Sequence, residues 1–112
     1  MAEADASVLC GANSYEEKYY FNERFGNLPK SVQDELHALC VLFTEECGGI
    51  LVLRFSEDGS LLFETRASDN DYLYDEIETG LQVRKLRKEK EELFSALELY
   101  YRLLFLKKND EA

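Results

Sequence analysis

Residues 50–66 read ILVLRFSEDGSLLFETR, two apolar runs on either side of the polar segment SEDGS. This pattern predicts a β-hairpin, because a three-residue loop over 57–59, with Gly59 in the left-handed conformation, gives a common turn with a bulge. The loop fixes a register in which one face of the hairpin pairs Phe55 with Leu61, Leu53 with Phe63 and Leu51 with Thr65. A hairpin alone is marginally stable, so we expect a third strand or helices to pack on it.

A helix is predicted before the hairpin. Pro29 suits its first position, where the missing N–H costs nothing, and Gly48 and Gly49 suit its end, where a left-handed residue is needed. Between these residues, apolar side chains recur at helical spacing along one narrow stripe. The stripe consists of Val32, Leu36, Leu39, Cys40, Phe43 and Cys47.

A long helix is predicted after the hairpin, over about 72–107. Ser68, Asp69 or Asp71 can cap its start, and Gly80 is its expected weak point or bend. The apolar residues of its main core stripe are Leu86, Leu93, Leu97, Tyr100 and Leu104. Helical spacing places all five side chains on one side of the helix.

The segment before Pro29 has conflicting signals. A capping box at 14–17 favours a helix, whereas the aromatic run KYYFN at 18–22 favours a strand. We expect the strand, because the hairpin needs a third partner. The sequence therefore predicts a single α+β domain over 1–112, with frayed ends at about 1–7 and 108–112. In this domain two helices, the C-terminal one long, pack on a small antiparallel sheet built around the hairpin.

Composition limits the classes of protein that this chain can represent. Its 112 residues carry a net charge of −10, and 46% of them are hydrophobic. That balance suits a soluble globular domain, and the negative charge opposes binding to nucleic acid. No apolar run reaches the length of a membrane span, and no signal-peptide pattern opens the chain. Three cysteines without a CxxC pair suit free thiols in the cytoplasm.

Four soft metal ligands are present: Cys10, His37, Cys40 and Cys47. Cys40 and Cys47 lie seven residues apart, which is roughly 10 Å of rise on a continuous helix. Two thiolates on one zinc ion lie under roughly 4 Å apart, so this set does not predict a zinc site. His37 accompanies no recognised active-site motif, and the acidic segment 68–78 fails the calcium-loop pattern after two ligands. We therefore expect no catalytic, cofactor-binding or metal-binding residues.

Two features remain that could form a binding surface. The segment RKLRKEK at 84–90 is a local basic island, which the helical pairs Lys85/Glu89, Arg87/Glu91 and Lys88/Glu92 are expected to neutralise. From Phe94 onward the last helix is apolar around most of its circumference. Its second apolar stripe consists of Leu99, Leu103 and Leu106, with Tyr101 and Phe105 nearby. Either this surplus is a protein–protein contact, or the aromatic segment 15–25 folds over it within the chain.

Several short motifs resemble those of a known family. They are LCGAN at 9–13 with Tyr15, KYYFN at 18–22, CVLFTE at 40–45, GGI at 48–50, YDEI at 74–77 and the segment 92–101. In these motifs the chain is similar to a family of small proteins from Gram-positive anaerobic bacteria, known only as a domain of unknown function. The resemblance extends from about Leu9 to Leu106. It implies a bacterial cytoplasmic protein and transfers no site residue.

These observations favour a non-catalytic interaction or regulatory module that acts as a homodimer through its last helix. Its expected partners are a second copy or another protein, with neither a membrane nor nucleic acid involved. The alternative is a small-molecule-binding protein or minor enzyme. Its pocket would lie near Tyr15, Tyr19, His37 and Cys40.

Overall fold

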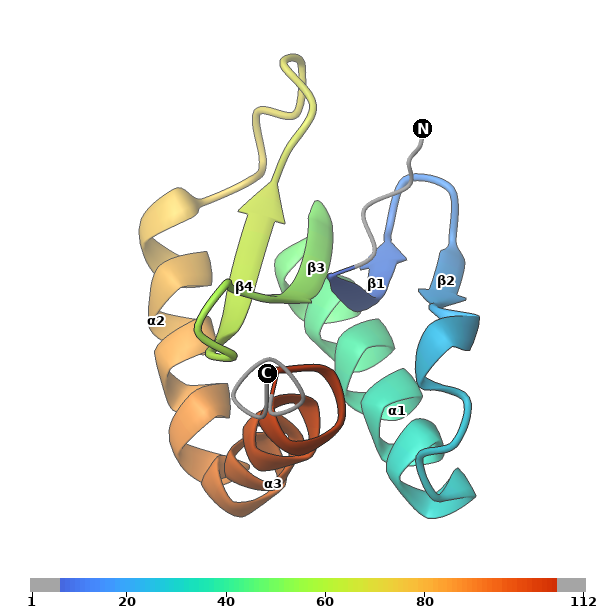
Figure 1. Ribbon diagram of the computed structural model, residues 1–112. Helices are drawn as coiled ribbons and strands as arrows, with labels where there is room; N and C mark the ends of the chain where they lie inside the picture. The colour runs from blue at the N-terminus through green and yellow to red at the C-terminus, as the bar shows by residue number, and fades with distance from the viewer. Residues whose placement is uncertain (1–6, 107–112) are drawn as a thin grey trace.

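The computed structural model describes residues 7–106, which form one four-stranded antiparallel sheet with helices packed on it (Figure 1). The strands are β1 (Val8–Asn13), β2 (Lys18–Phe21), β3 (Ile50–Phe55) and β4 (Leu61–Arg66). The helices are α1 (Lys30–Cys47), α2 (Glu76–Glu89) and α3 (Glu91–Tyr101), with a short 3-10 helix η1 (Glu23–Phe25) and a π-helical turn η2 (Arg102–Leu106). The α+β class is confirmed. The predicted helix count was wrong, because three α-helices occur within 7–106 where two were expected.

The hairpin has the predicted register. β3 and β4 pair Phe55 with Leu61, Leu53 with Phe63 and Leu51 with Thr65, and Gly59 has a φ of 89°. Along β3, buried side chains alternate with half-buried ones, as expected for a strand with one covered face. Local turn chemistry and alternation were sufficient to fix this element.

The sequence did not predict strand β1. The order β2-β1-β3-β4 places β1 between the hairpin and β2, so the predicted strand in 18–22 exists but pairs with β1. Gly11 lies at the centre of β1, where a Cβ atom would come within 2.9 Å of the Leu51 carbonyl oxygen. Ser7, expected among the frayed residues, accepts a hydrogen bond from the Phe55 N–H at 2.9 Å. The other ends expected to fray, 1–6 and 108–112, lie outside the described residues.

Helix α1 covers the inner face of the sheet and ends where predicted, at Cys47 before Gly48 with a φ of 75°. Pro29 is the residue that precedes the helix rather than its first turn. The buried residues of the predicted stripe, Leu36, Leu39, Cys40 and Phe43, pack against the strands. The opposite, outer face of the sheet carries the exposed side chains of Tyr20 and Leu62.

The predicted long helix is two helices joined at Lys90, whose φ of −113° and ψ of 31° interrupt the helical backbone. Gly80, the expected weak point, lies inside α2. The predicted start of this helix was also wrong. Asp75 caps α2 by accepting hydrogen bonds from the Ile77 and Glu78 N–H groups at 3.0 Å. Residues 72–75, expected in the helix, belong to the loop before it.

The joint at Lys90 is bonded to a neighbouring helix. The Lys90 ammonium lies 2.9 Å from a carboxylate oxygen of Glu35 on α1, which ties this joint to the neighbouring helix. Beyond the joint, α3 turns the side chains of Phe94, Leu97 and Tyr101 into the core. Leu104, predicted in the core stripe, is 48% exposed, because the core face shifts at the joint and again at η2.

Candidate functional site

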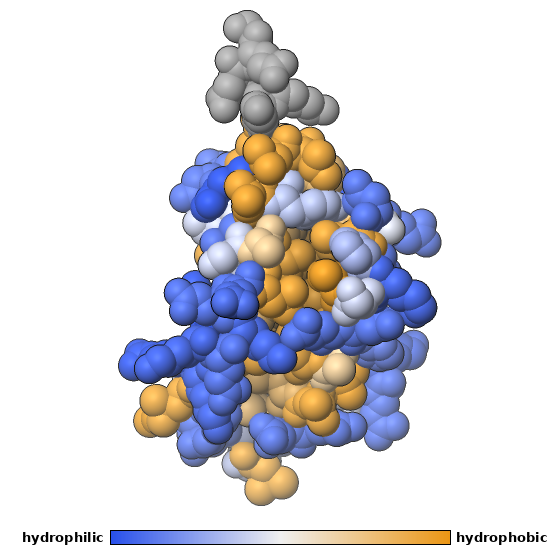
Figure 2. All heavy atoms as spheres, turned by 90° about the horizontal axis from the view of Figure 1, so that it is seen from below, coloured by the Kyte–Doolittle hydropathy of each residue, from blue (hydrophilic) through white to orange (hydrophobic). Residues whose placement is uncertain are grey.

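The last helix leaves an apolar strip exposed. Leu99 and Leu103, one helical turn apart, are 56% and 50% exposed, and Leu104 beside them is also half exposed. We refer to Leu99, Leu103 and Leu104 as the α3 strip. Figure 2 views the molecule from the side where α3 lies. Apolar side chains gather next to the grey atoms and again near the centre, with hydrophilic side chains around them.

The other residues expected on this surface have different surroundings. Tyr101 is buried, with its ring stacked on Phe55 at 4.2 Å between centroids. Phe105 and Leu106 are half-buried against the core. The π-helical turn brings the Phe105 ring to 5.2 Å from that of Tyr101. Tyr101 is therefore a core residue, and the exposed part of the predicted surface is Leu99 and Leu103.

The segment before α1 covers part of the apolar surface of the last helix. This is the alternative in which the aromatic segment folds over that helix within the chain. The ring of Phe25 lies 5.2 Å from that of Phe105, and the guanidinium of Arg24 lies 4.5 Å from the same ring. The Tyr100 hydroxyl donates a 2.6 Å hydrogen bond to Asn27. This intramolecular cover accounts for the aromatic residues of α3 and η2 and leaves the leucines of the α3 strip in contact with water.

The alternative pocket is formed in part. Tyr19 and His37 stack with ring centroids 4.3 Å apart, and they line a hollow of about 630 Å³ between β2 and α1. Tyr15 lies elsewhere, because its hydroxyl donates to Asp71 at 2.6 Å and accepts from the Ser68 N–H at 3.1 Å. Cys40 is fully buried and lines no part of this hollow. Only two of the four residues, Tyr19 and His37, therefore line the hollow.

A buried thiol pair lies behind Tyr19. The sulfurs of Cys10 and Cys40 are 3.8 Å apart, and both residues are fully buried. The hydrogen bond with Cys10, together with burial, raises the pKa of the Cys40 thiol. Burial raises the pKa of the Tyr19 hydroxyl, which lies in the interior beside Cys10. Among the described residues this hydroxyl has no hydrogen-bond partner of normal geometry. Raised pKa values keep these groups protonated, which opposes nucleophilic chemistry at neutral pH.

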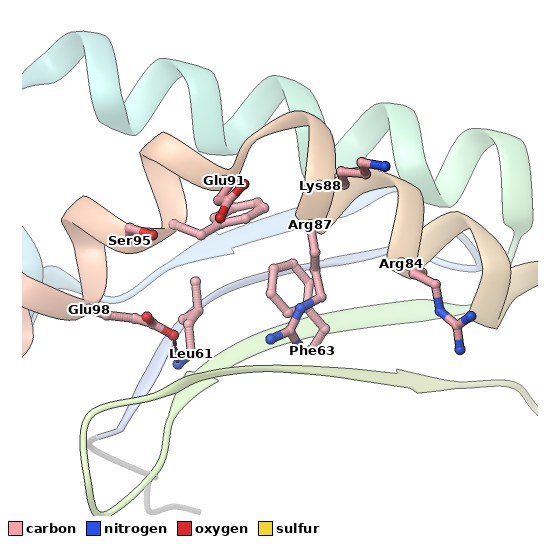
Figure 3. A pocket seen from close by; sticks show the side chains of 9 residues that line it. Leu61, Phe63, Arg84, Arg87, Lys88, Glu91, Ser95 and Glu98 are labelled. Carbon is pink, nitrogen blue, oxygen red and sulfur yellow. Dashed lines mark hydrogen bonds between the residues drawn. The ribbon is translucent and has the colours of Figure 1, made fainter.

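A basic groove lies between β4 and the joint of α2 and α3 (Figure 3). It has a volume of about 380 Å³ and is lined by Leu61, Phe63, Arg84, Arg87, Lys88, Glu91, Phe94, Ser95 and Glu98. The guanidinium of Arg87 lies 5.0 Å from the centre of the Phe63 ring, a cation–π contact. A carboxylate oxygen of Glu98 accepts a 2.8 Å hydrogen bond from the Leu61 N–H.

The expected neutralisation of the basic island does not occur. Among residues 7–106, none of the predicted pairs Lys85/Glu89, Arg87/Glu91 and Lys88/Glu92 forms an ion pair. Two of these pairs span the joint at Lys90, where the helical spacing that would align them is lost. The groove therefore keeps three cationic side chains, Arg84, Arg87 and Lys88.

Sequence reasoning did not identify the exposed apolar residues of the loop before α2. Tyr72 and Leu73, placed in the predicted helix, are 92% and 95% exposed in the loop between β4 and α2, which projects from the molecule (Figure 1). The run of Ser, Asp and Asn at 68–71 was the signal for a loop, because these residues favour turns.

Two classes of site can be assessed directly in the part of the chain that the structure describes. Within it, no group of three or more His, Cys, Asp or Glu side chains is arranged to hold a metal ion. Nor does any helix among these residues have the length and apolar character needed to cross a bilayer.

Comparison with known proteins identifies the chain at the level of family. No curated protein and no solved structure matches it. Residues 6–109, nearly the whole chain, match DUF6145, a family of unknown function. The resemblance to a domain of unknown function is thereby confirmed, and the match carries no activity, ligand or site residue. The chain belongs to the DUF6145 family of proteins of unknown function.

Proposed function

We propose that this protein is a non-catalytic interaction module that pairs with a second copy of itself through the α3 strip. The observation that carries the proposal is the exposure of Leu99 on α3, whose other side is buried in the core, and of Leu103 on the π-helical turn that continues α3. Apolar surface of this kind gains free energy when it leaves water. Pairing with an identical strip is the commonest arrangement, because a two-fold axis lets each strip cover the other.

The polar groups that flank the strip support this proposal. Glu98 is bonded to the Leu61 N–H, and the Nε of Arg102 donates to the Asp58 carbonyl at 2.9 Å. Both charged side chains are thus held back toward the hairpin and away from the leucines that follow them in sequence. A second copy can approach the strip with less desolvation of charged groups than the sequence alone would suggest.

The net charge of −10 opposes pairing of two copies. Added salt screens this repulsion and leaves apolar contact largely unaffected, so the dimer should tighten as ionic strength rises. We further propose that the module acts in the cytoplasm of a Gram-positive anaerobic bacterium. The sequence motifs and the three free thiols support this location, because oxidising compartments favour disulfides.

Light scattering and sedimentation equilibrium at tens of micromolar test the proposal. We expect the wild-type protein to have the mass of two chains, and the double variant Leu99→Glu/Leu103→Glu to be a folded monomer. The matched control is Leu42→Glu/Leu81→Glu, which adds the same charge at leucines that are equally exposed on α1 and α2. This control should remain a dimer.

Three results would contradict the proposal: a wild-type mass of one chain, a strip variant that stays dimeric, or a control that dissociates as readily as the strip variant. Circular dichroism of each variant shows whether it is folded. A variant that fails to fold is replaced by Leu99→Gln/Leu103→Gln, which removes the apolar strip without adding charge.

A further inference from the structure

β4 is an edge strand whose free backbone groups can be assigned from the hairpin. The Ser56 N–H donates to the Ser60 carbonyl at 2.8 Å, so Ser56 and Ser60 form a hydrogen-bonded pair. Hydrogen-bonded and non-bonded pairs alternate along an antiparallel ladder. The backbone groups of Leu62 and Glu64 therefore face β3, and those of Leu61, Phe63 and Thr65 face outward.

The contact at Leu61 agrees with this assignment. Its outward N–H is the group that Glu98 accepts from, at 2.8 Å (Figure 3). A carboxylate thus already binds the edge of β4 at one end of the groove. Phe63 and Thr65 lie further along the same edge, and no backbone partner beyond β3 accompanies them in residues 7–106. These two residues offer donors and acceptors for an added strand.

The side chains beside this edge are basic. α2 runs next to β4 in the fold (Figure 1), and Arg84 and Arg87 extend from α2 toward β4 (Figure 3). Arg87 is positioned by its contact with Phe63, a residue of the edge strand itself. The acidic side chains of the groove are Glu98, which is engaged with Leu61, and Glu91 on α3. A strand added to β4 would lie beside these two guanidinium groups. Neither of them forms an ion pair with another described residue.

We propose that the edge of β4 binds an extended acidic peptide segment of a partner protein, which adds to the sheet as a further strand along the basic groove. Backbone hydrogen bonds to Phe63 and Thr65 hold the segment, and its carboxylates pair with Arg84 and Arg87. In strand addition the main chain supplies affinity and alternate side chains supply specificity. Arginine favours carboxylate partners because its planar fork can bind both oxygens. Nucleic acid offers phosphates to the arginines but no backbone that continues a sheet.

The test uses the heptapeptide acetyl-Thr-Glu-Thr-Glu-Thr-Glu-Thr-amide, whose glutamates alternate as one face of a strand requires. Titration into the isotopically labelled full chain, followed by amide NMR spectra, should shift the amides of Phe63 and Thr65 most. The same peptide with lysine in place of glutamate should give no saturable shift. Binding should weaken as salt is added, because charge pairing contributes to it.

Two protein variants separate the charge from the backbone. Arg84→Glu/Arg87→Glu should weaken binding about tenfold or more, whereas the control Lys18→Glu/Lys85→Glu, which changes the net charge equally outside the groove, should bind as the wild type does. Thr65→Pro should also abolish binding, because it removes an outward N–H while leaving the ladder to β3 complete. If that variant does not fold, the heptapeptide with N-methylated central residues gives the same test from the ligand side.

Equal binding of the lysine peptide would overturn the proposal, and so would full binding by the arginine variant or by the N-methylated peptide. Saturable binding of single-stranded oligouridylate at the groove, without binding of the acidic peptide, would assign the groove to nucleic acid instead. Because the shifts are read residue by residue, the result does not depend on whether the chain is a dimer.

Discussion

Truncation of Leu97 and of Leu99 to alanine should have very different effects, although the two leucines are two residues apart on α3. Leu97 is 2% exposed and Leu99 is 56% exposed. Leu97→Ala removes the equivalent of three buried carbon groups, worth about 2.4 kcal/mol at ~0.8 kcal/mol each. The cavity left behind adds about 1 kcal/mol. We therefore expect a loss of about 3 kcal/mol in the free energy of unfolding.

Leu99→Ala should cost about 1 kcal/mol or less in the monomer, because more than half of its side chain is already in water and no cavity forms. The assay is urea unfolding followed by circular dichroism, at protein concentrations from below one micromolar to tens of micromolar. At the lowest concentration the two variants should differ by about 2 kcal/mol. At the highest concentration Leu99→Ala should fall further below the wild type in stability, because association stabilises the wild type as its concentration rises.

Two results would refute this reasoning. Equal losses for the two variants at the lowest concentration would mean that the assignment of the faces of α3 is wrong. A Leu99→Ala effect that does not change with concentration would leave the assignment of faces intact but contradict the proposed pairing through the α3 strip.

Three further predictions follow from the thiols and the projecting loop. Under native conditions Cys10 and Cys40 should resist a thiol reagent such as iodoacetamide, while half-buried Cys47 reacts slowly. In urea all three thiols should react, and mass spectrometry counts the labels on each chain. The pKa of the Cys40 thiol is higher in the folded protein than in an unfolded chain, where it is about 8.5. The free energy of unfolding should therefore fall as the pH rises above about 8.5. Cys40→Ala should flatten this pH dependence in urea titrations between pH 7.5 and about 10. Tyr15→Phe removes the hydroxyl that binds Asp71 and the Ser68 N–H, so limited proteolysis should cut the loop before α2 faster, with a change in global stability of only about 1 kcal/mol.

Part of the candidate site could be predicted from sequence because exposure on a helix follows from spacing. Leu99 and Leu103 were expected on a second stripe and are exposed. The roles of Tyr101 and Phe105 could not be predicted, because Phe25 and Phe55, which pack on them, lie far away in the sequence. No periodicity within α3 indicates which of its apolar sides those rings will cover.

The basic groove shows the same division. The run of basic residues at 84–90 is visible in the sequence, and so are the alternating residues of β4. Their juxtaposition depends on where α2 lies relative to the sheet edge. Helical i,i+4 spacing also predicted that Arg87 would pair with Glu91, which would have neutralised part of the positive charge. The joint at Lys90 removed that pairing and left Arg87 to pack on Phe63.

The sequence by itself determined the elements whose signals are local: the hairpin with its loop at Gly59, and α1 with its end at Gly48. Their turn and cap residues act through backbone conformations that a few neighbouring residues settle. Only the tertiary structure decided that 8–13 is a strand, because β1 forms by backbone pairing with strands on both sides. It also decided that the last helix divides at Lys90, because the residues around that joint favour a helix and nothing local in the sequence marks the break.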